Sequence, residues 1–410
     1  MANVIFYIIC VLIFLRPHYG SLGVSIFGAD AIIVLLLTFA LCLNLVKAGG
    51  KSRSLLASNL VLLTLLALIS VVNVCTGVDP SGTLINLLKF VYYSVFFWFT
   101  LSVMNRVPDL RVTVFNIWNR TYFVIFSVAI IQLLEPPLLS NIVHIVFGTL
   151  KLRSLWTGNA RVYSTFFNAN WFGVYLVCVT LGWVAFYRLK AISTIQFILR
   201  ILSVMVLFII AGSRTAIVGL AVAGVSLLAL NLRPTLLLTG SVFGLVAFRF
   251  ISLMSERVPL LSRTLGRFSV FAVALGRGLV LDDSVTSDRF SLWQDAAQAV
   301  SLRPLLGHGS LGELSPHNSY LTLLVIYGAF GLVIIVMFLL SSLIIVLRQS
   351  SRKPENRVLD EWVGVFMLSF AAMSFAAEFI FTTQVMLMVL FSLAFWIAWR
   401  IRPSAVSGGE

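Results

Sequence analysis

The sequence predicts an all-α integral membrane protein with about twelve transmembrane helices. Hydrophobic residues make up 60% of its 410 residues and charged residues only 11%, and the mean hydropathy is +1.03. A soluble domain of this length could not cover its surface with so few polar groups. Apolar runs of about 20 residues, the length of a membrane helix, recur along the chain. Since backbone groups in lipid must be satisfied within the segment, we expect these runs to be helical.

The apolar runs predict the boundaries of the helices, in chain order. The first run has neither a basic start nor an Ala-x-Ala exit, so we expect a membrane helix there rather than a cleaved signal. The predicted spans are 2–15, 22–46, 54–75, 84–104, 112–134, 170–187, 193–212, 215–231, 235–254, 317–347, 359–380 and 384–399.

The basic residues predict the orientation of these spans. One set of alternate loops carries fifteen of them: Lys47, Lys51, Arg53, Arg106, Arg111, Arg188, Lys190, Arg200, Arg233, Arg348, Arg352, Lys353, Arg357, Arg400 and Arg402. The opposite short loops carry five: Arg16, Lys151, Arg153, Arg161 and Arg214. Positive charge accumulates on the cytoplasmic side, so both termini are expected there. The net charge of +14 therefore does not indicate a nucleic-acid partner.

The polar segment 255–316 is predicted to be a large periplasmic loop between the ninth and tenth helices of a single membrane domain, residues 1–410. Ser287 is a plausible N-cap for a helix over 288–301. Its apolar face would consist of Phe290, Trp293, Ala297 and Val300. Residues 259–280 mix apolar and basic side chains, which suits an interfacial amphipathic helix.

His317 stands where this loop meets the tenth apolar run, in the sequence Pro316-His-Asn-Ser-Tyr-Leu321. An imidazole can accept a proton at neutral pH, so His317 is a candidate general base. Asn318 and Ser319 could orient it, and Asn318 could also bind a sugar hydroxyl. The structural alternative is a hydrogen-bonded histidine at the membrane interface.

Two arginines on the same predicted side could bind phosphate. Arg214 lies in a turn between two spans, where Gly212 lets a ligand approach and a guanidinium can grip phosphate oxygens bidentately. Arg289 begins the loop helix. The alternatives are an interfacial anchor for Arg214 and an ion pair with a nearby aspartate for Arg289.

Charged residues inside the membrane are costly and are functional candidates. Lys89 is the strongest candidate for a further phosphate ligand. The others, Asp30, Arg249 and Glu378, are expected to form structural ion pairs. The loop from Arg161 to Asn170 is a candidate lining for a donor site.

Several chemistries lack their sequence signatures. The chain shows no P-loop, Rossmann glycine pattern or zinc-ligand spacing, and no Asp-x-Asp pair for a metal-bound sugar nucleotide. The four cysteines fall in apolar runs without paired spacing. We therefore expect a reaction that needs neither a metal ion nor a cofactor.

Four segments between about residue 160 and 335 form an ordered set of motifs. They are Phe166-Phe-Asn-Ala-Asn170-x2-Gly173, Gly212-Ser-Arg-Thr-Ala216, Arg289-x3-Trp293 leading to Pro304-Leu-Leu-Gly307-His-Gly309, and His317-Asn-Ser-Tyr-Leu321 followed by Tyr327-Gly328-x2-Gly331. In these segments the chain resembles the bacterial O-antigen ligase and polymerase superfamily of membrane glycosyltransferases, whereas the first 150 residues are similar only in hydropathy.

This resemblance implies a GT-C-like enzyme in the inner membrane of a Gram-negative bacterium. It implies transfer of O-antigen glycan from undecaprenyl diphosphate to a hydroxyl of lipid A–core at the periplasmic face. Together with the residues above, it makes His317, Arg214 and Arg289 the expected catalytic residues of an inverting reaction. The expected substrate-binding residues are Lys89, Arg161, Asn170, Asn318 and Tyr320.

Two alternatives remain open at the sequence level. The resemblance also covers polymerases, which extend a lipid-linked glycan; the outer-loop arginines Arg153 and Arg161 suit that activity. A transporter of polyprenyl-linked glycan could use the same charges, but it would be expected to have an internal repeat and charges near the midplane.

Overall fold

The computed structural model is all-helical over the residues it describes, with no β-strand among them. These residues are 65, 68–76, 79–107, 109–134, 138–139, 141, 162, 164–166, 168–231, 289–314, 316–348, 354–375, 377, 379–380 and 383–401. The helices are α4 (Pro80–Met104), α5 (Leu110–Leu134), α7 (Ala169–Arg188), α8 (Thr194–Ala211), α9 (Arg214–Asn231), α13 (Arg289–Leu302), α14 (Ser319–Arg348), α15 (Pro354–Ser374) and α16 (Thr383–Ile401).

Five stretches among the described residues are long and apolar enough to cross a membrane: α4, α5, α7, α8 and residues 319–337 of α14. This finding agrees with an integral membrane protein. The predicted spans at 2–15, 22–46 and 235–254 and the interfacial helix at 259–280 lie outside the described residues, as does much of the span at 54–75. The total of twelve spans therefore stays a prediction.

Local capping explains where several helices begin and end. α4 starts at Pro80, before the predicted residue 84, because the Asp79 side chain caps it by accepting from the Ser81 amide. α8 starts with a capping box, in which Ser193 and Gln196 satisfy each other's backbone amides. It ends at Gly212, whose left-handed backbone (φ 55°) closes the helix.

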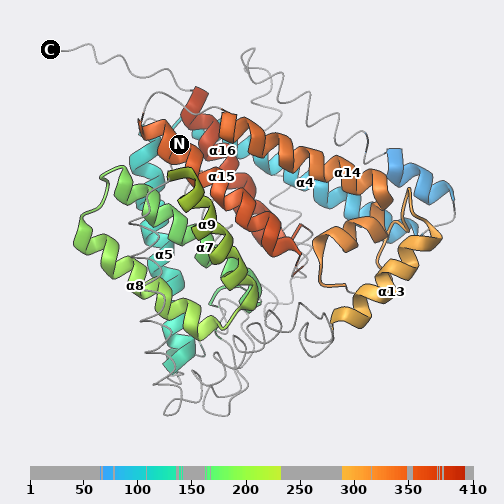
Figure 1. Cartoon of the computed structure of the whole chain (residues 1–410), viewed down its shortest axis with the longest axis horizontal. Coiled ribbons are helices and arrows are strands. Elements are labelled where there is room, and N and C mark those ends of the chain that lie inside the picture. The colour runs from blue at the N-terminus through green and yellow to red at the C-terminus, as the bar shows by residue number, and fades with distance from the viewer. Residues whose placement is uncertain are drawn as a thin grey trace.

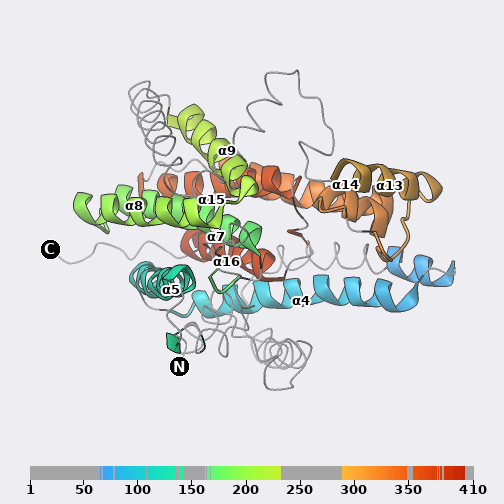
Figure 2. The same cartoon turned by 90° about the horizontal axis from the view of Figure 1, so that it is seen from below.

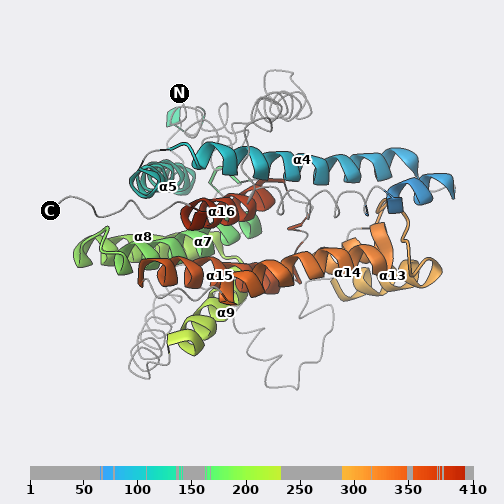
Figure 3. The same ribbon diagram turned by 90° about the horizontal axis from the view of Figure 1, so that it is seen from above.

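The helices pack in successive layers (Figures 1–3). α16 lies between α4 and α15, and α9 covers the far side of α15. α7 packs against α8, α9 and α15. Aromatic side chains fill the space between α5, α7 and α15, where the Trp118 and Trp362 rings meet edge to face at 5.6 Å between centroids. Gly182 on α7 makes room for the Trp118 ring, which a Cβ at that position would approach within 2.7 Å.

A polar layer closes one end of the bundle, where α5 and α15 begin and α7 and α16 end. The buried Asp360 carboxylate accepts from Arg400 and from the Trp396 indole, the latter at 2.7 Å. The buried Glu361 carboxylate pairs with Arg188 and with Arg357. α15 was predicted at 359–380, but it starts at Pro354 and ends at Ser374, so these carboxylates lie in its first turns.

Arg200, assigned to a cytoplasmic loop from the charge pattern, in fact lies inside α8. Its guanidinium carbon lies 4.4 Å from the centre of the Trp183 ring, and one amine donates to the Asn119 side chain at 2.9 Å. Stacking on an aromatic face stabilises the cation away from water, which explains why the helix tolerates it.

α14 is two helices joined at Gly328, whose backbone (φ 64°, ψ −166°) is not helical. The sequence predicted one uninterrupted span, because apolar residues continue through this point. The loop 304–309 fills the break: the His308 and Gly309 amides donate to the carbonyls of Val325 and Ile326, at 2.6 and 2.8 Å. In the other direction, the amides of residues 329 and 330 donate to the carbonyls of residues 304 and 305. Backbone groups freed by the break are thereby satisfied, as a membrane environment requires.

The loop helix predicted at 288–301 is α13, which lies beside the first part of α14 (Figure 1). Its buried face differs from the prediction. Ala296 is fully buried, whereas Ala297 is exposed. The inward positions are therefore Trp293, Ala296 and Val300, spaced three and four residues apart, because α13 packs on protein along that stripe.

We predict that Gly328→Ala destabilises the protein by about 1–3 kcal/mol. An added Cβ would lie 2.3 Å from the Leu305 carbonyl, and the positive φ also disfavours alanine. Thermal unfolding in detergent measures the change. The control is Gly224→Ala in α9, where a Cβ meets nothing within 4 Å; equal stability of the two variants would contradict the prediction.

Candidate active site

The turn between α8 and α9 carries Arg214. Gly212 ends α8, and Ser213 caps α9 by accepting from the Ala216 amide at 3.3 Å. Arg214 is the first residue of α9. The turn contacts the start of α7, whose other end carries Arg188 of the polar layer, so it lies at the opposite end of the bundle, which we call the site end.

α7 supports this turn from the side. The Ser213 hydroxyl donates to the Asn170 side chain at 3.0 Å, and Asn168 caps α7 by accepting from the Asn170 amide at 2.7 Å. A Cβ at Gly173 would lie 2.7 Å from the Ala216 Cβ. The segment from Phe166 to Gly173 therefore has a physical role, which is to hold the α8–α9 turn against α7.

The chain just before α7 is anchored by an amide pair that the sequence did not reveal. The Gln132 side chain on α5 both donates to the Ser164 carbonyl and accepts from its amide, each at 2.8 Å. Ser164 is fully buried with φ 52°. Gln132 thus fixes residues 162–166 beside the site end. The signal was a lone amide in an apolar run, a pattern that indicates a buried partner.

His317 occupies a constrained turn immediately before α14. It was expected to begin the helix, but α14 starts at Ser319, because buried Asn318 caps it by accepting from the Tyr320 and Leu321 amides. His317 is exposed and has φ 49°, in the left-handed region that a histidine seldom adopts. The Trp293 indole on α13 donates to the Pro316 carbonyl at 2.8 Å, which holds the other side of the turn.

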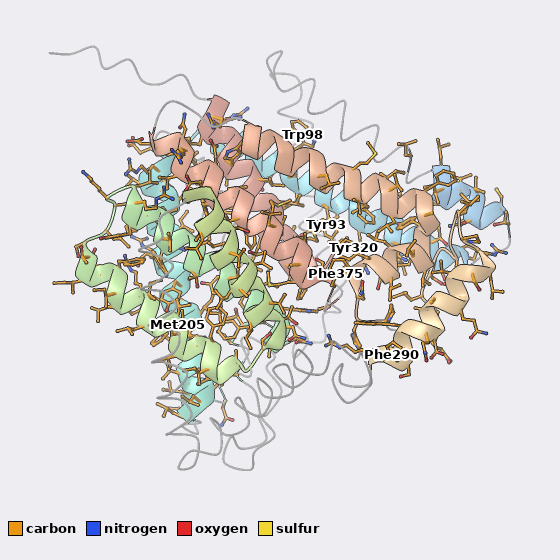
Figure 4. The ribbon with its side chains drawn as sticks, viewed as in Figure 1. Tyr93, Trp98, Met205, Phe290, Tyr320 and Phe375 are labelled. Atoms are coloured by element: carbon orange, nitrogen blue, oxygen red, sulfur yellow. The ribbon has the colours of Figure 1, made fainter. Side chains whose placement is uncertain are left out.

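The start of α14 is fastened to the end of α15. The buried Ser319 hydroxyl donates to the Ala377 carbonyl at 2.7 Å and accepts from the Ile380 amide at 3.3 Å. The Tyr320 hydroxyl donates to the Ala371 carbonyl at 2.9 Å. Its ring lies 4.5 Å from the Phe375 ring, and Figure 4 shows the two side by side.

The end of α15 also contacts α9, which relates the two candidate residues. A Cβ at Gly219 would lie 2.4 Å from the Met373 sulfur, so α9 and α15 are in close contact there. Gly219 is five residues beyond Arg214, and Met373 is four residues before Ala377. The turns that carry Arg214 and His317 therefore flank the same end of α15.

The remaining candidates lie on other elements or outside the described residues. Arg289 is the half-buried first residue of α13, four residues before Trp293, whose indole reaches the His317 turn. Lys89 is half-buried on α4. Arg161 lies outside the described residues, as do Asp30, Arg249 and Glu378. Tyr320 and Asn318 both lie at the start of α14. The Tyr320 hydroxyl and the Asn318 side-chain oxygen make the structural hydrogen bonds described above.

The buried carboxylates lie away from the site end. In the part of the chain that the structure describes, the buried carboxylates Asp360 and Glu361 belong to the polar layer at the opposite end. Within the same described part, no group of three His, Cys, Asp or Glu residues could hold a metal ion.

The chain was compared with known proteins. Residues 197–336 match the family model described as O-antigen ligase. This match covers about a third of the chain, and it includes the Arg214 turn, α13, the loop 304–309 and the His317 turn. It confirms the resemblance to the O-antigen ligase family. No curated protein gives a significant match to the chain.

We predict that His317→Gly is more stable than His317→Val by about 1–2 kcal/mol, because the left-handed backbone disfavours a side chain branched at Cβ. Thermal unfolding of both variants in detergent measures the difference. Equal stability would mean that the turn readily adopts another conformation in solution.

Proposed function

Starting from the match to the O-antigen ligase family, we propose that this protein is a membrane glycosyltransferase that moves O-antigen glycan from undecaprenyl diphosphate to a hydroxyl of lipid A–core. The reaction would take place at the periplasmic face of the inner membrane of a Gram-negative bacterium. The supporting observation is that the His317 turn is bonded to the segment after α15, while α9, which follows the Arg214 turn, packs at Gly219 against the last turn of α15. Within the family match, these two turns and α13 supply a base and two cations.

In the proposed reaction, His317 removes the proton from the acceptor hydroxyl while its oxygen attacks the anomeric carbon. The bond between that carbon and the diphosphate oxygen breaks, and its electron pair leaves with undecaprenyl diphosphate. The single displacement inverts the anomeric centre. Because the diphosphate is a good leaving group, the reaction needs no separate general acid.

Arg214 and Arg289, assisted by Lys89, would hold the diphosphate and stabilise the negative charge that grows on the leaving oxygen. Arg161 and Asn170 are proposed to line the donor site, and Asn318 and Tyr320 the sugar site. Of these, Asn170 and Asn318 also support the turns that carry Arg214 and His317. No metal ion or cofactor takes part in the proposed reaction, since positioning and fixed charges supply the catalysis.

We predict that His317→Asn lowers turnover by about 10²–10⁴-fold while donor binding persists. Asparagine tolerates the left-handed backbone but cannot act as a base at neutral pH. The measurement uses purified protein, a polyprenyl-diphosphate glycan and lipid A–core, with capped lipopolysaccharide as the product. Normal transfer by this variant would exclude His317 as the base.

We further predict that Arg214→Ala weakens donor binding and lowers turnover, by about 10²-fold or more in turnover. Arg120→Ala on α5, which removes a cation elsewhere on the bundle, serves as the control. Normal transfer by the Arg214→Ala protein would show that its guanidinium does not hold the diphosphate.

The same assay separates the ligase from its alternatives. Capped lipopolysaccharide is the product of a ligase, whereas lengthened lipid-linked chains would identify a polymerase. Movement of the lipid-linked glycan across a bilayer without a change in its covalent structure would identify a transporter.

A further inference from the structure

Two buried asparagines connect the N-terminal half of the chain to the loop that fills the break in α14. The Asn73 side chain donates to the Leu306 carbonyl at 3.0 Å and lies 3.5 Å from the Ile326 carbonyl. The Asn86 side chain on α4 donates to the Gly309 carbonyl at 3.1 Å. Both asparagines are more than nine-tenths buried. Neither side chain bonds to the helix that carries it: Asn86 donates to the loop, and Asn73 contacts the loop and the last turn of the first part of α14.

The start of α4 adds a third contact with the same loop. A Cβ at Gly82 would lie 2.5 Å from the Ser310 Cβ, so only glycine permits this approach. A hydrogen bond from Ser310 to the Asp79 carboxylate contributes to a lowered pKa of that carboxyl, after the larger effects of Ser81 and the Gly82 amide. Residues 304–310 are therefore held on one side by α14 and on the other by residues 73–86.

The loop is also the C-terminal attachment of α13. The Gly307 amide donates to the Arg303 carbonyl at 3.1 Å, and the His308 ring contacts the Ala299 carbonyl at 2.8 Å. At the other end of α13, Trp293 is bonded to Pro316, beside His317. α13 is thus fixed at two points, the loop 304–310 and the His317 turn, and Arg289 is its first residue.

We propose that Asn86 and Asn73 are positioning residues, which set the placement of α13 and hence of Arg289 relative to His317 through the loop 304–310. This role rests on the proposed function, because it requires Arg289 to contact the donor. Lys89 follows Asn86 by three residues and so lies on the same side of α4. One face of α4 therefore carries Lys89, a proposed phosphate ligand, and Asn86, which anchors the loop attached to α13. The second proposed phosphate ligand, Arg289, is on α13.

The chemistry of the two side chains fits this role better than simple packing. An amide in an apolar helix costs free energy unless it is bonded, and a backbone carbonyl at a broken helix needs a donor. An apolar residue of similar volume would fill the same space, but it would leave the carbonyls of Leu306 and Gly309 without these donors. A leucine substitution therefore distinguishes the two roles: it preserves simple packing but removes the hydrogen bond to the loop.

The test compares Asn86→Leu with Asn105→Leu, the same change at the exposed other end of α4. Hydrogen exchange of the whole protein, followed by mass spectrometry, reports on residues 304–310 without any substrate. We expect exchange in this loop to be about tenfold faster in Asn86→Leu, since a buried hydrogen bond is lost. The Asn105→Leu protein should exchange like the unmodified protein. Unchanged loop exchange in Asn86→Leu and in Asn73→Leu would overturn the proposal.

The second measurement is a double-mutant cycle on glycan transfer with Arg289→Ala. If Asn86 acts through Arg289, Asn86→Leu raises KM for the donor and lowers turnover, but it adds no further loss to Arg289→Ala. Losses that multiply in the double variant would contradict positioning of Arg289. If Arg289→Ala alone transfers glycan normally, the proposed role of Arg289 fails, and the positioning proposal fails with it whatever the exchange data show.

Discussion

The pairing of residues 304–309 with the break in α14 is the interaction on which the candidate site depends. A helix interrupted inside a membrane exposes backbone groups that lipid cannot satisfy. Here four backbone hydrogen bonds between α14 and one short loop, two donated by each, satisfy them, and two glycines with positive φ, Gly307 and Gly328, let the two segments approach. The break also fixes the first part of α14, the part that begins just after His317.

The two ends of the bundle differ in the interactions that hold them together. At one end, carboxylates on α15 bind Arg188 of α7 and Arg400 of α16, together with Arg357 of α15 itself. At the site end, hydrogen bonds from Ser319, Tyr320 and Ser213 fasten the turns to the helices around them. The ion pairs join α15 to α7 and α16 at one end, and the proposed catalytic residues belong to the opposite end.

Hydropathy predicted most of the described helices to within a few residues, because lipid demands long apolar runs whatever the sequence around them. It could not predict the break at Gly328, since apolar residues continue through it and the compensating loop is some twenty residues away in the chain. The buried face of α13 includes Ala296 and not the predicted Ala297, because tertiary packing decides which side of the helix meets its partner.

For the candidate site, the sequence indicated residue types but not how they are held. His317 and Arg214 were found because a polar residue at the border of an apolar run is unusual. Gln132, Asn73 and Asn86 were missed, although each is a lone amide in an apolar run, because their partners are backbone groups distant in the sequence. The family motifs gain a physical meaning from these contacts: Gly173 brings α7 to the Arg214 turn, and Gly307 and Gly328 bring the loop to α14.

The most direct test of the central claim is an experimental structure of the protein with a bound polyprenyl-diphosphate glycan. The account predicts that the guanidinium groups of Arg214 and Arg289 both contact the diphosphate. It also predicts that the His317 imidazole lies on the opposite side of the anomeric carbon, within reach of an attacking hydroxyl, about 3 Å away. A diphosphate bound away from both arginines, or a glycan whose anomeric carbon is remote from His317, would contradict it.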